Sequence, residues 1–488
     1  MGKAVVINRL ASGIPGLDGL LGGGFPEFSL NIIAGAPGSG KTTLAHQLMF
    51  SQAKPDSRAL YFTVLGEPPL KMLRYQQQFS FFDNAKILDS IRFVDLAADI
   101  AGGDFDRLLT RIVKEVKNVS PSLVFIDSFR SAALAGDGGD NEKRLALQIF
   151  VQHLALQMTG WQATTFLDGE YSELGSDASP IFTVADGILW LAQNVHRNAM
   201  VRKIQVVKMR GQAQTPGWHT FRIGDAGLQV FPRAIVGTVT TGGEASGGVR
   251  AKVRIAMGIA GLDDMLGGGL PAGYSLLVVG PSGSGKTILS TEFLAEGVRL
   301  GEPGVLAAFE KSPSQLLSGK LDALVRGGKV GVINTRSLNL SIDEILHDLI
   351  EMIEKMHAKR VVLDSLSGFE LALAPEFSED FRGSLYRMIA VLTGMGVTIL
   401  MTSELEDRYT DLRFSPFGNA FLADAIVMQR YIEIAGEFKR LISVVKVRGS
   451  AHSTALRMFE ISDGGIVIGE PLPKYEGILS GRPIHMVA

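Results

Sequence analysis

The sequence predicts an α/β protein with two similar domains in tandem, each a doubly wound, mainly parallel sheet flanked by helices. Three observations predict it. At 488 residues the chain is too long for one ordinary hydrophobic core. Several segments of the first half recur, in the same order, in the second half. In both halves, short apolar runs suited to buried strands alternate with helical stretches.

The repeat rests on five ordered matches. GLDGLLGGGFP begins at Gly16 and returns as GLDDMLGGGLP at Gly261, and GAPGSGKTT at Gly35 returns as GPSGSGKTI at Gly280, with the same separation. LVFIDS, VVKMRG and FRIGDAG are answered in order by RVVLDS, VVKVRG and FEISDGG. Between the copies, VGTVTTGGEASGG has the composition of a flexible linker. We therefore predict a first domain over 1–235, a linker over 236–250 and a second domain over 251–488.

The elements of each copy follow from these patterns. SLNIIAG and SLLVVG predict buried strands that enter a glycine loop, and TTLAHQLMFSQA and TILSTEFLAEGVRL predict the helices that follow. Further strands are expected at ALYFTVL, SLVFIDS and ATTFLD in the first copy and at GVLAAFE, RVVLDS and VTILMTS in the second. Helices are expected at FDRLLTRIVKEVKN and SIDEILHDLIEMIEKM. This alternation predicts parallel strands with helical crossovers.

Composition excludes several classes of protein. Apolar residues make up 46% and charged residues 20%, as in a folded globular chain, and no stretch approaches the roughly 20 apolar residues that span a bilayer. The chain has no cysteine, so we expect a cytoplasmic protein without disulfides. A net charge of -2 gives no general attraction for nucleic acid, and the segments 131–144 and 371–383 are acidic. We expect neither a membrane nor a nucleic-acid partner.

The two glycine loops predict phosphate sites. Glycines let successive backbone N–H groups surround phosphate oxygens, and the next helix presents its positive end. In this pattern Lys41 and Lys286 reach the β- and γ-phosphates, and the hydroxyls of Thr42 and Thr287 ligate Mg²⁺. The sequence thus predicts two Mg-ATP sites. Their loops comprise Gly35, Ala36, Pro37, Gly38, Ser39, Gly40, Lys41, Thr42 and Thr43, and Gly280, Pro281, Ser282, Gly283, Ser284, Gly285, Lys286, Thr287 and Ile288.

Two kinds of carboxylate complete the predicted sites. Asp127 and Asp364 end apolar strands, where an aspartate holds Mg²⁺; the alternative is an aspartate that caps a turn or helix. Glu67 and Glu310 lie at the end of the second expected strand of each copy, ALYFTVL and GVLAAFE. Both are candidates to orient the attacking water, and Glu310 is also a candidate metal ligand. The alternative for both is a carboxylate that balances a helix dipole.

A Lys-x-Arg-Gly segment follows in each copy. Lys208 and Arg210, like Lys446 and Arg448, lie at i, i+2 spacing on one face of an expected strand. They lie far along the chain from their own glycine loops, which favours contact with a nucleotide on a neighbouring subunit, as an arginine finger makes. Surface ion pairs are the alternative. Met209 and Val447 lie between the paired side chains.

These residues together resemble the KaiC family, RecA-like P-loop NTPases with two domains that include the circadian-clock kinase. The GLD…GGG-P openings, both P-loops, both Lys-x-Arg-Gly segments, FRIGDAGLQVFP and YEGILSGRP, which spans Tyr475 to Pro483, carry the resemblance over nearly the whole chain. It implies a homo-hexamer of two stacked rings with ATP at the subunit interfaces, where the Lys-x-Arg residues contact a neighbour's γ-phosphate. Asp225, Arg440 and His452 are further candidates, and His452 is equally typical of a hydrogen-bonded surface residue. A KaiB-like or other signalling protein is the implied partner.

The departures from the family pattern matter as well. The family carries two adjacent glutamates after the second strand, whereas here the pairs are Gly66-Glu67 and Glu310-Lys311. Glu310 matches the position of the base and Glu67 its neighbour, so hydrolysis is better supported in the second domain.

The kinase features of the family are also altered. Ala420 and Phe421 stand where the clock kinase has its phosphorylated Ser-Thr pair, and Ser415 is the nearby hydroxyl considered. The long charged tail through which a KaiA-type partner acts is not expected, since the chain stops soon after Gly481.

The leading hypothesis is an ATP hydrolase whose nucleotide state controls conformation and partner binding. A Ser/Thr autokinase of the clock type is an alternative. A RecA-like DNA recombinase or helicase is another, although it calls for basic loops that this chain lacks at 131–144 and 371–383. A scaffold that uses bound ATP only to hold an interface together is the third.

Overall fold

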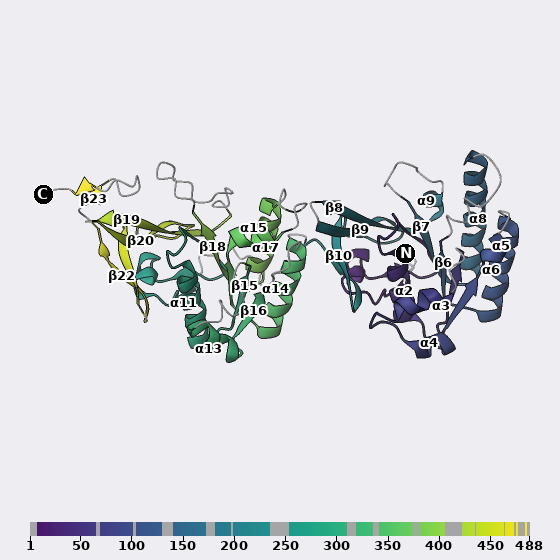
Figure 1. The fold of residues 1–488 in the computed structure, drawn as a ribbon, viewed down its shortest axis with the longest axis horizontal. Helices are drawn as coiled ribbons and strands as arrows, with labels where there is room; N and C mark the ends of the chain where they lie inside the picture. The colour runs from purple at the N-terminus through teal and green to yellow at the C-terminus, as the bar shows by residue number, and fades with distance from the viewer. Residues whose placement is uncertain are drawn as a thin grey trace, which may run out of the picture. The chain divides into compact units, whose positions relative to one another are not determined.

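The computed structural model describes residues 7–64, 69–100, 104–128, 140–171, 181–196, 199–234, 253–309, 319–334, 341–373, 377, 381–405, 422–434, 436–462, 464–472, 475–476 and 484–485. The chain forms two compact units, Met1–Arg233 and Ala234–Ala488. Each unit is an α/β domain built on one large sheet (Figure 1).

The described residues of the first unit form a nine-stranded sheet and a short antiparallel pair. The pair is β1 (Arg9–Leu10) with β2 (Phe25–Pro26). The strands of the sheet are β3 (Leu30–Gly35), β4 (Ala59–Thr63), β5 (Ile91–Asp95), β6 (Leu123–Asp127), β7 (Thr164–Glu170), β8 (Gly187–His196), β9 (Ala199–Met209), β10 (His219–Gly224) and β11 (Gly227–Phe231). Their spatial order is β11-β10-β9-β8-β3-β7-β6-β4-β5. Neighbours from β5 to β8 are parallel and those from β8 to β11 antiparallel.

Helices cover both faces of this sheet. They are α1 (Leu17–Leu21), α2 (Lys41–Gln52), α3 (Pro69–Gln76), α4 (Asn84–Asp89), α5 (Ala97–Ile100), α6 (Phe105–Val119), α8 (Asp140–Gly160) and α9 (Ile181–Val184). One core packs α1 and α2 against one face, and a second core packs α6 and α8 against the other (Figure 1). In α6, Leu108, Ile112 and Val116 recur every four residues, which gives that helix one buried stripe.

The second unit repeats this plan in its described residues. Its sheet strands are β14 (Ser275–Gly280), β15 (Gly304–Ala308), β16 (Val330–Asn334), β17 (Arg360–Asp364), β18 (Thr398–Glu404), β19 (Ala425–Ile434), β20 (Glu437–Val447), β21 (Arg457–Ser462) and β22 (Gly465–Pro471). Their order is β16-β15-β17-β18-β14-β19-β20-β21-β22. The first six are joined in parallel and the last four antiparallel. Short antiparallel pairs join β12 (Arg254–Ile255) to β13 (Leu270–Pro271) and β23 (Tyr475–Glu476) to β24 (Ile484–His485).

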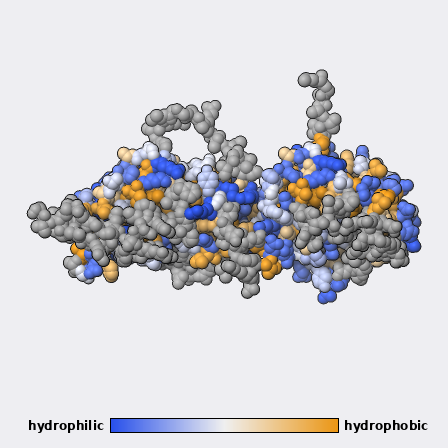
Figure 2. All heavy atoms as spheres, turned by 90° about the horizontal axis from the view of Figure 1, so that it is seen from above, coloured by the Kyte–Doolittle hydropathy of each residue, from blue (hydrophilic) through white to orange (hydrophobic). Residues whose placement is uncertain are grey.

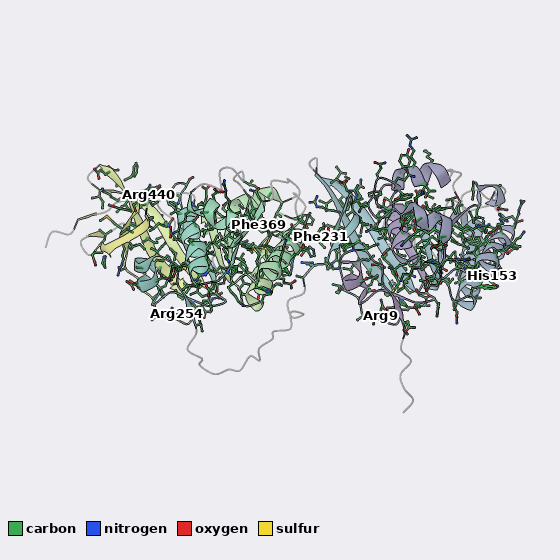
Figure 3. The ribbon with its side chains drawn as sticks, turned by 90° about the horizontal axis from the view of Figure 1, so that it is seen from below. Arg9, His153, Phe231, Arg254, Phe369 and Arg440 are labelled. Carbon is green, nitrogen blue, oxygen red and sulfur yellow. The ribbon has the colours of Figure 1, made fainter. Side chains whose placement is uncertain are left out.

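The helices of the second unit also pack on both faces of its sheet. They are α10 (Ala260–Met265), α11 (Lys286–Arg299), α13 (Lys320–Arg326), α14 (Ile342–Met356), α15 (Leu366–Ala372) and α17 (Phe381–Gly394). One core contains residues of α10 and α11, and the other contains residues of α14, α15 and α17. Phe369 of α15 lies inside the second of these, stacked on Phe309 with ring centroids 4.5 Å apart (Figure 3).

The predicted fold class is confirmed. The expected strand, glycine loop and helix appear in both units, and the strands predicted from apolar runs match within one or two residues. The parallel strands β5, β8, β16 and β19 were not predicted, and of the antiparallel extensions β9–β11 and β20–β22 only a strand at each Lys-x-Arg segment, in β9 and β20, was expected. In each unit these extensions continue the sheet past β8 or β19. Lys208 and Lys446 lie on the antiparallel strands β9 and β20, whereas Arg210 and Arg448 lie in the turns that follow, past the strand on which both side chains were predicted.

Among the described residues, no helix is long and apolar enough to cross a membrane. Figure 2 shows hydrophilic and hydrophobic residues interspersed over the described part of the face it presents. This finding agrees with the absence of apolar spans in the sequence.

Candidate functional site

The glycine loops have the same backbone geometry in both units. β3 ends at Gly35 and α2 begins at Lys41, while β14 ends at Gly280 and α11 begins at Lys286. The glycine before each helix has a left-handed φ, 103° at Gly40 and 102° at Gly285. A Cβ added there would lie 2.8 Å from Ile223 Cδ1 or 2.7 Å from Ile461 Cδ1, which are side-chain ends that can shift, so it is the left-handed backbone conformation that requires glycine.

The loop lysines are buried and fold back over their loops. Lys41 Nζ donates to the carbonyl oxygens of Gly35 and Ala36, both at 3.0 Å. Lys286 Nζ donates to those of Gly280 and Pro281, both at 2.8 Å. Each ammonium group is therefore fixed at the mouth of a loop whose N–H groups bind phosphate.

A threonine hydroxyl and an aspartate meet at the start of each helix. Thr42 Oγ1 donates to Asp127 Oδ2 at 3.0 Å, and Thr287 Oγ1 donates to Asp364 Oδ2 at 3.0 Å. The capping alternative does not describe Asp364, because Ser365 caps α15 by accepting from the Gly368 N–H. A hydroxyl and a carboxylate at this spacing form an oxygen donor set suited to Mg²⁺.

A cavity opens at each glycine loop. The first-unit cavity is about 440 Å³ and the second about 270 Å³. The first is lined by Pro37, Gly38, Gly40, Lys41, Thr42, Thr43, Thr63, Met72, Asp127, Ser128, Glu170, Arg202 and Ile223. The second is lined by Ser282, Gly283, Gly285, Lys286, Thr287, Ile288, Asp364, Ser365 and Glu404. Both lie at the carboxyl ends of parallel strands, where this fold class binds ligands.

The remaining loop residues hold the lysines in place and form hydrogen bonds within each site. Gly35, Ala36, Gly280 and Pro281 supply the carbonyls that hold the lysines. Ser284 Oγ donates to Gln429 Oε1 at 2.9 Å. The Ser39 hydroxyl is buried with no hydrogen-bond partner among the described residues. The predicted loop residues therefore come together, and they fit a magnesium nucleotide through glycine N–H groups, one lysine, one hydroxyl and one carboxylate.

The two copies differ beside the aspartate. In the first unit Tyr61 Oη donates to Asp127 Oδ2 at 2.9 Å, and Asp168 of β7 lies in register with Asp127. In the second unit the residue at the Asp168 position is Thr402, whose Oγ1 donates to Asp364 Oδ1 at 2.6 Å. The matched sites thus place a carboxylate in one unit where the other has a hydroxyl.

The acidic groups of the first unit have perturbed pKa values. Burial, and then the nearby Asp127 carboxylate, raise the pKa of Asp168 well above its usual range. Burial also raises the pKa of Asp127, against the lowering effect of hydrogen bonds from Tyr61 and Thr42. The pKa of Tyr61 is raised well above its ordinary value by burial and by Asp127. Such shifts are typical of functional sites.

The Lys-x-Arg segments lie away from the cavities of their own units. Lys208 Nζ donates to the carbonyls of Phe182 at 3.0 Å and Thr183 at 3.2 Å, and Arg210 pairs with Asp186 at 3.2 Å. Partial burial and then the neighbouring arginine lower the pKa of Lys208.

The second copy matches the first. Lys446 Nζ donates to the Ala423 carbonyl at 2.7 Å, and Arg448 pairs with Asp424 at 3.4 Å. The ion-pair alternative thus describes both arginines within the chain.

The side chains between them are unavailable to a ligand. Met209 and Val447 are buried in the hydrophobic cores, so a nucleotide would meet only their backbone.

Three weaker candidates have separate places. Asp225 lies exposed in the turn between β10 and β11, where its carbonyl accepts from the Ser80 N–H at 2.9 Å. His452 Nδ1 lies 3.4 Å from the Ser450 carbonyl oxygen and outside the lining of the second cavity. Arg440, labelled in Figure 3, lies over the Tyr431 ring at 5.6 Å. A Cβ on Gly283 would lie 3.2 Å from the Tyr431 hydroxyl, so Arg440 is near its own glycine loop.

Sequence reasoning missed several residues at these sites. Arg202 lines the first cavity and is the repeat counterpart of Arg440, so the repeat itself could have identified it. Glu170 and Glu404 end β7 and β18 and line the two cavities, and their equivalence in the repeat was a usable signal. Asp168 and Thr402 carried no such signal, because the two copies differ there.

Some predicted residues lie outside the described residues. They are Glu67, Glu310, Ser415, Ala420 and Phe421. Among the described residues, no group of three or more histidine, aspartate or glutamate side chains is placed to hold a metal without other ligands.

Comparison with known proteins agrees with this architecture. The KaiC ATPase family model matches twice, over residues 10–235 and 255–472. The circadian clock oscillator protein KaiC of Picosynechococcus sp. is 27% identical, over 98% of this chain and 93% of its own length. The circadian clock protein KaiC3 of Synechocystis sp. is 27% identical, over 98% of this chain and 95% of its own length. KaiC of Thermosynechococcus vestitus is 26% identical, over 98% and 92%. Two P-loop domains in one chain, each matched by the same family model, show that the protein belongs to the KaiC ATPase family.

Proposed function

We propose that the protein binds Mg-ATP in both domains and hydrolyses it, and that its nucleotide state controls conformation and partner binding. The observation that carries the proposal is the repeated Lys, Thr and Asp geometry, with Thr–Asp oxygens 3.0 Å apart in both domains. Bound Mg²⁺ would neutralise charge on the β- and γ-phosphates. The other groups that contact the nucleotide would come from this chain or from a neighbouring subunit.

The residues have distinct roles in this proposal. The loop N–H groups of 35–43 and 280–288 bind the phosphates, and Lys41 and Lys286 hold the β- and γ-phosphate oxygens. Thr42 with Asp127, and Thr287 with Asp364, orient the metal and its water. Glu310 orients the attacking water in the second domain, and Glu67 is the candidate in the first. Since Glu67 matches only the neighbour of the family's base, we propose faster hydrolysis in the second domain.

We further propose a homo-hexamer with nucleotides at subunit interfaces. Lys208 lies six positions from Arg202 on the same strand, which is roughly 20 Å along the strand direction. Lys208 is therefore too far along β9 to reach the cavity that Arg202 lines. The same separation holds between Lys446 and Arg440 on β20. This spacing supports a contact of the Lys-x-Arg residues with a neighbour's γ-phosphate. From membership of the KaiC family we also propose a cytoplasmic signalling protein of KaiB type as partner.

The test uses ATP labelled at the γ-phosphate with the purified full chain and Mg²⁺. We expect free labelled phosphate to accumulate, with turnover lowered at least tenfold by Lys286→Ala and by Glu310→Ala. Lys41→Ala is the matched control, since it changes the equivalent residue of the slower domain, and we expect it to reduce turnover less. Turnover unchanged in both Lys286→Ala and Glu310→Ala would overturn the proposal.

A second function, ATP as a structural ligand of the first domain, is favoured by the Gly66-Glu67 departure. It predicts labelled nucleotide retained in the Lys286→Ala variant without phosphate release. Denaturing gel electrophoresis of the same reactions reports any autokinase activity, which would appear as label bound to protein. Absence of such label would agree with Ala420 and Phe421 at the family's phosphorylated positions.

A further inference from the structure

Asp168 of the first domain is a buried carboxylate with no evident structural task. It lies on β7 beside Asp127 of β6 on one side and Ile33 of β3 on the other. Its residue is only 2% exposed, and neither carboxylate oxygen has a hydrogen-bond partner among the described residues. A buried acceptor left in this state is costly, and a cation bound beside it would remove that cost.

The second domain shows what a structural residue does at this place. Thr402 occupies the equivalent position on β18, and its hydroxyl donates to Asp364 Oδ1 at 2.6 Å. That contact satisfies one oxygen of the metal-site aspartate from within the protein. The first domain therefore places a carboxylate in register with Asp127 at the position where the second domain has a hydroxyl donor.

The local charges make the contrast stronger. Lys41 is the cation that acts on both Asp127 and Asp168, and its ammonium group donates to the Gly35 and Ala36 carbonyls. Glu170, at the end of β7, adds a further negative charge that acts on Asp127. One lysine thus acts on both aspartates, while Glu170 adds to the negative charge around Asp127. A divalent cation between Asp127 and Asp168 would offset their repulsion.

We propose that Asp168 is a second carboxylate ligand for the divalent cation of the first domain, acting with Asp127 and Thr42 directly or through water. The site takes a hard cation, Mg²⁺ or Mn²⁺, with water in the remaining positions, because its donors are all oxygen. It needs no nucleotide to supply charge, so the first domain binds the cation before ATP. The second domain, with one carboxylate and Thr402, binds it tightly only together with ATP. This inference rests on the proposed role of Asp127 and Thr42 in holding the metal.

The test measures Mn²⁺ binding to the nucleotide-free full chain by electron paramagnetic resonance of the free ion. We expect one tight Mn²⁺ per chain in the natural protein. Asp168→Thr, which copies the second domain, should weaken that site about 10- to 100-fold, the usual effect of removing a supporting metal ligand. Asp168→Asn keeps the shape but removes the charge, and should weaken it similarly. Natural affinity in both variants would overturn the proposal.

The reciprocal variant tests the same idea as a gain. Thr402→Asp copies the first domain into the second and should add a second tight Mn²⁺ per chain. It keeps the proposal falsifiable even where Asp168→Thr does not fold, since a Thr402→Asp chain that folds and still binds one Mn²⁺ contradicts it. Retention of ATP by the natural protein is measured separately with Mg²⁺ present. Loss of ATP binding there would sink the proposed function, whereas unchanged Mn²⁺ binding in the variants would sink only the role of Asp168.

Discussion

Lys41 and Lys286 are among the few charged side chains buried in this protein, with exposures of 7% and 8%. A lysine is rarely buried unless its charge is compensated, and each of these donates to two loop carbonyls. In a phosphate site the same ammonium group turns to the nucleotide. The two lysines should therefore report separately on the two sites.

We expect the natural chain to bind two ATP molecules, and Lys41→Met and Lys286→Met to bind one each. Methionine keeps the length of the side chain and removes its charge, so the loops keep their packing while phosphate binding weakens by at least about tenfold. Equilibrium dialysis with labelled ATP measures the stoichiometry. A single variant that lost both sites would show that the sites are not independent, and a variant that kept both would contradict the assigned role.

His46 of α2 is fully buried beneath the first site. Its ring lies 4.6 Å from that of Tyr61, the tyrosine bonded to Asp127. Burial lowers the pKa of His46 to about 3 from its ordinary 6.5. Between these two pKa values the unfolded chain binds a proton at His46 that the folded chain does not. Protonation of His46 therefore does not affect the free energy of unfolding above about pH 6.5, and it lowers that free energy as the pH falls below this value.

We expect that lowering the pH from about 7 to about 5 costs roughly 2 kcal/mol of folding free energy at His46, at about 1.4 kcal/mol per pH unit. His46→Phe keeps an aromatic ring at this place and should abolish that part of the pH dependence. Hydrogen exchange of the α2 amides in the full chain measures it. Protonation of Asp127 and Asp168, whose pKa values are raised, changes the free energy of unfolding in the direction opposite to that of His46. Both chains contain these aspartates, so their effect cancels when the curve of the variant is subtracted from that of the natural protein. Parallel curves would contradict the prediction.

At the scale of elements, the helix starts have defined causes. Ser341 caps α14, and its hydroxyl accepts from the Glu344 N–H at 3.1 Å. In α14 the buried stripe of Ile345, Leu349 and Ile353 repeats every four residues and places the helix on the sheet. The cap and stripe together were readable in the sequence.

Ser341→Ala should reduce the free energy of unfolding by about 1 kcal/mol, because one N–H at the start of α14 loses its acceptor. Ser341→Asp restores an acceptor and should recover most of the loss. Urea unfolding of each variant, monitored through hydrogen exchange of the α14 amides, measures both changes. If alanine and aspartate behave alike, the cap contributes nothing measurable.

At the scale of the whole molecule, the two units have separate cores and separate cavities. The Gly- and Ser-rich segment 236–250 is predicted to join them without a core of its own. Folding and nucleotide protection should then be properties of each unit.

Brief digestion with a protease of broad specificity should cut within the linker predicted over residues 236–250 and release two fragments, each with one glycine loop. Mg-ATP should slow further digestion of both fragments, because ligand binding stabilises the folded form. In Lys286→Met the protection of the second fragment should disappear while that of the first remains. Mass spectrometry of the fragments identifies the first cleavage site. A first cleavage outside this linker would contradict the predicted domain boundary.

The fold class, the duplication and the two phosphate loops could all be predicted from the amino-acid sequence. These are local or periodic features: a strand pattern, a glycine loop and a capped helix each occupy one short segment, and the duplication presented each of them twice. The Thr42–Asp127 and Thr287–Asp364 pairs were expected for the same reason, since the family motif names both partners.

The residues beside those pairs became known only from the folded arrangement of the strands. Asp168 and Tyr61 reach Asp127 from other strands of the sheet, and Arg202 reaches the cavity from an antiparallel extension that the apolar pattern did not reveal. Their effect depends on the register between strands far apart in the chain, and no local pattern encodes it. The sequence marked the copies as unequal through Glu67 and Glu310. Packing added a second inequality at the metal site, because only one copy places a buried carboxylate there.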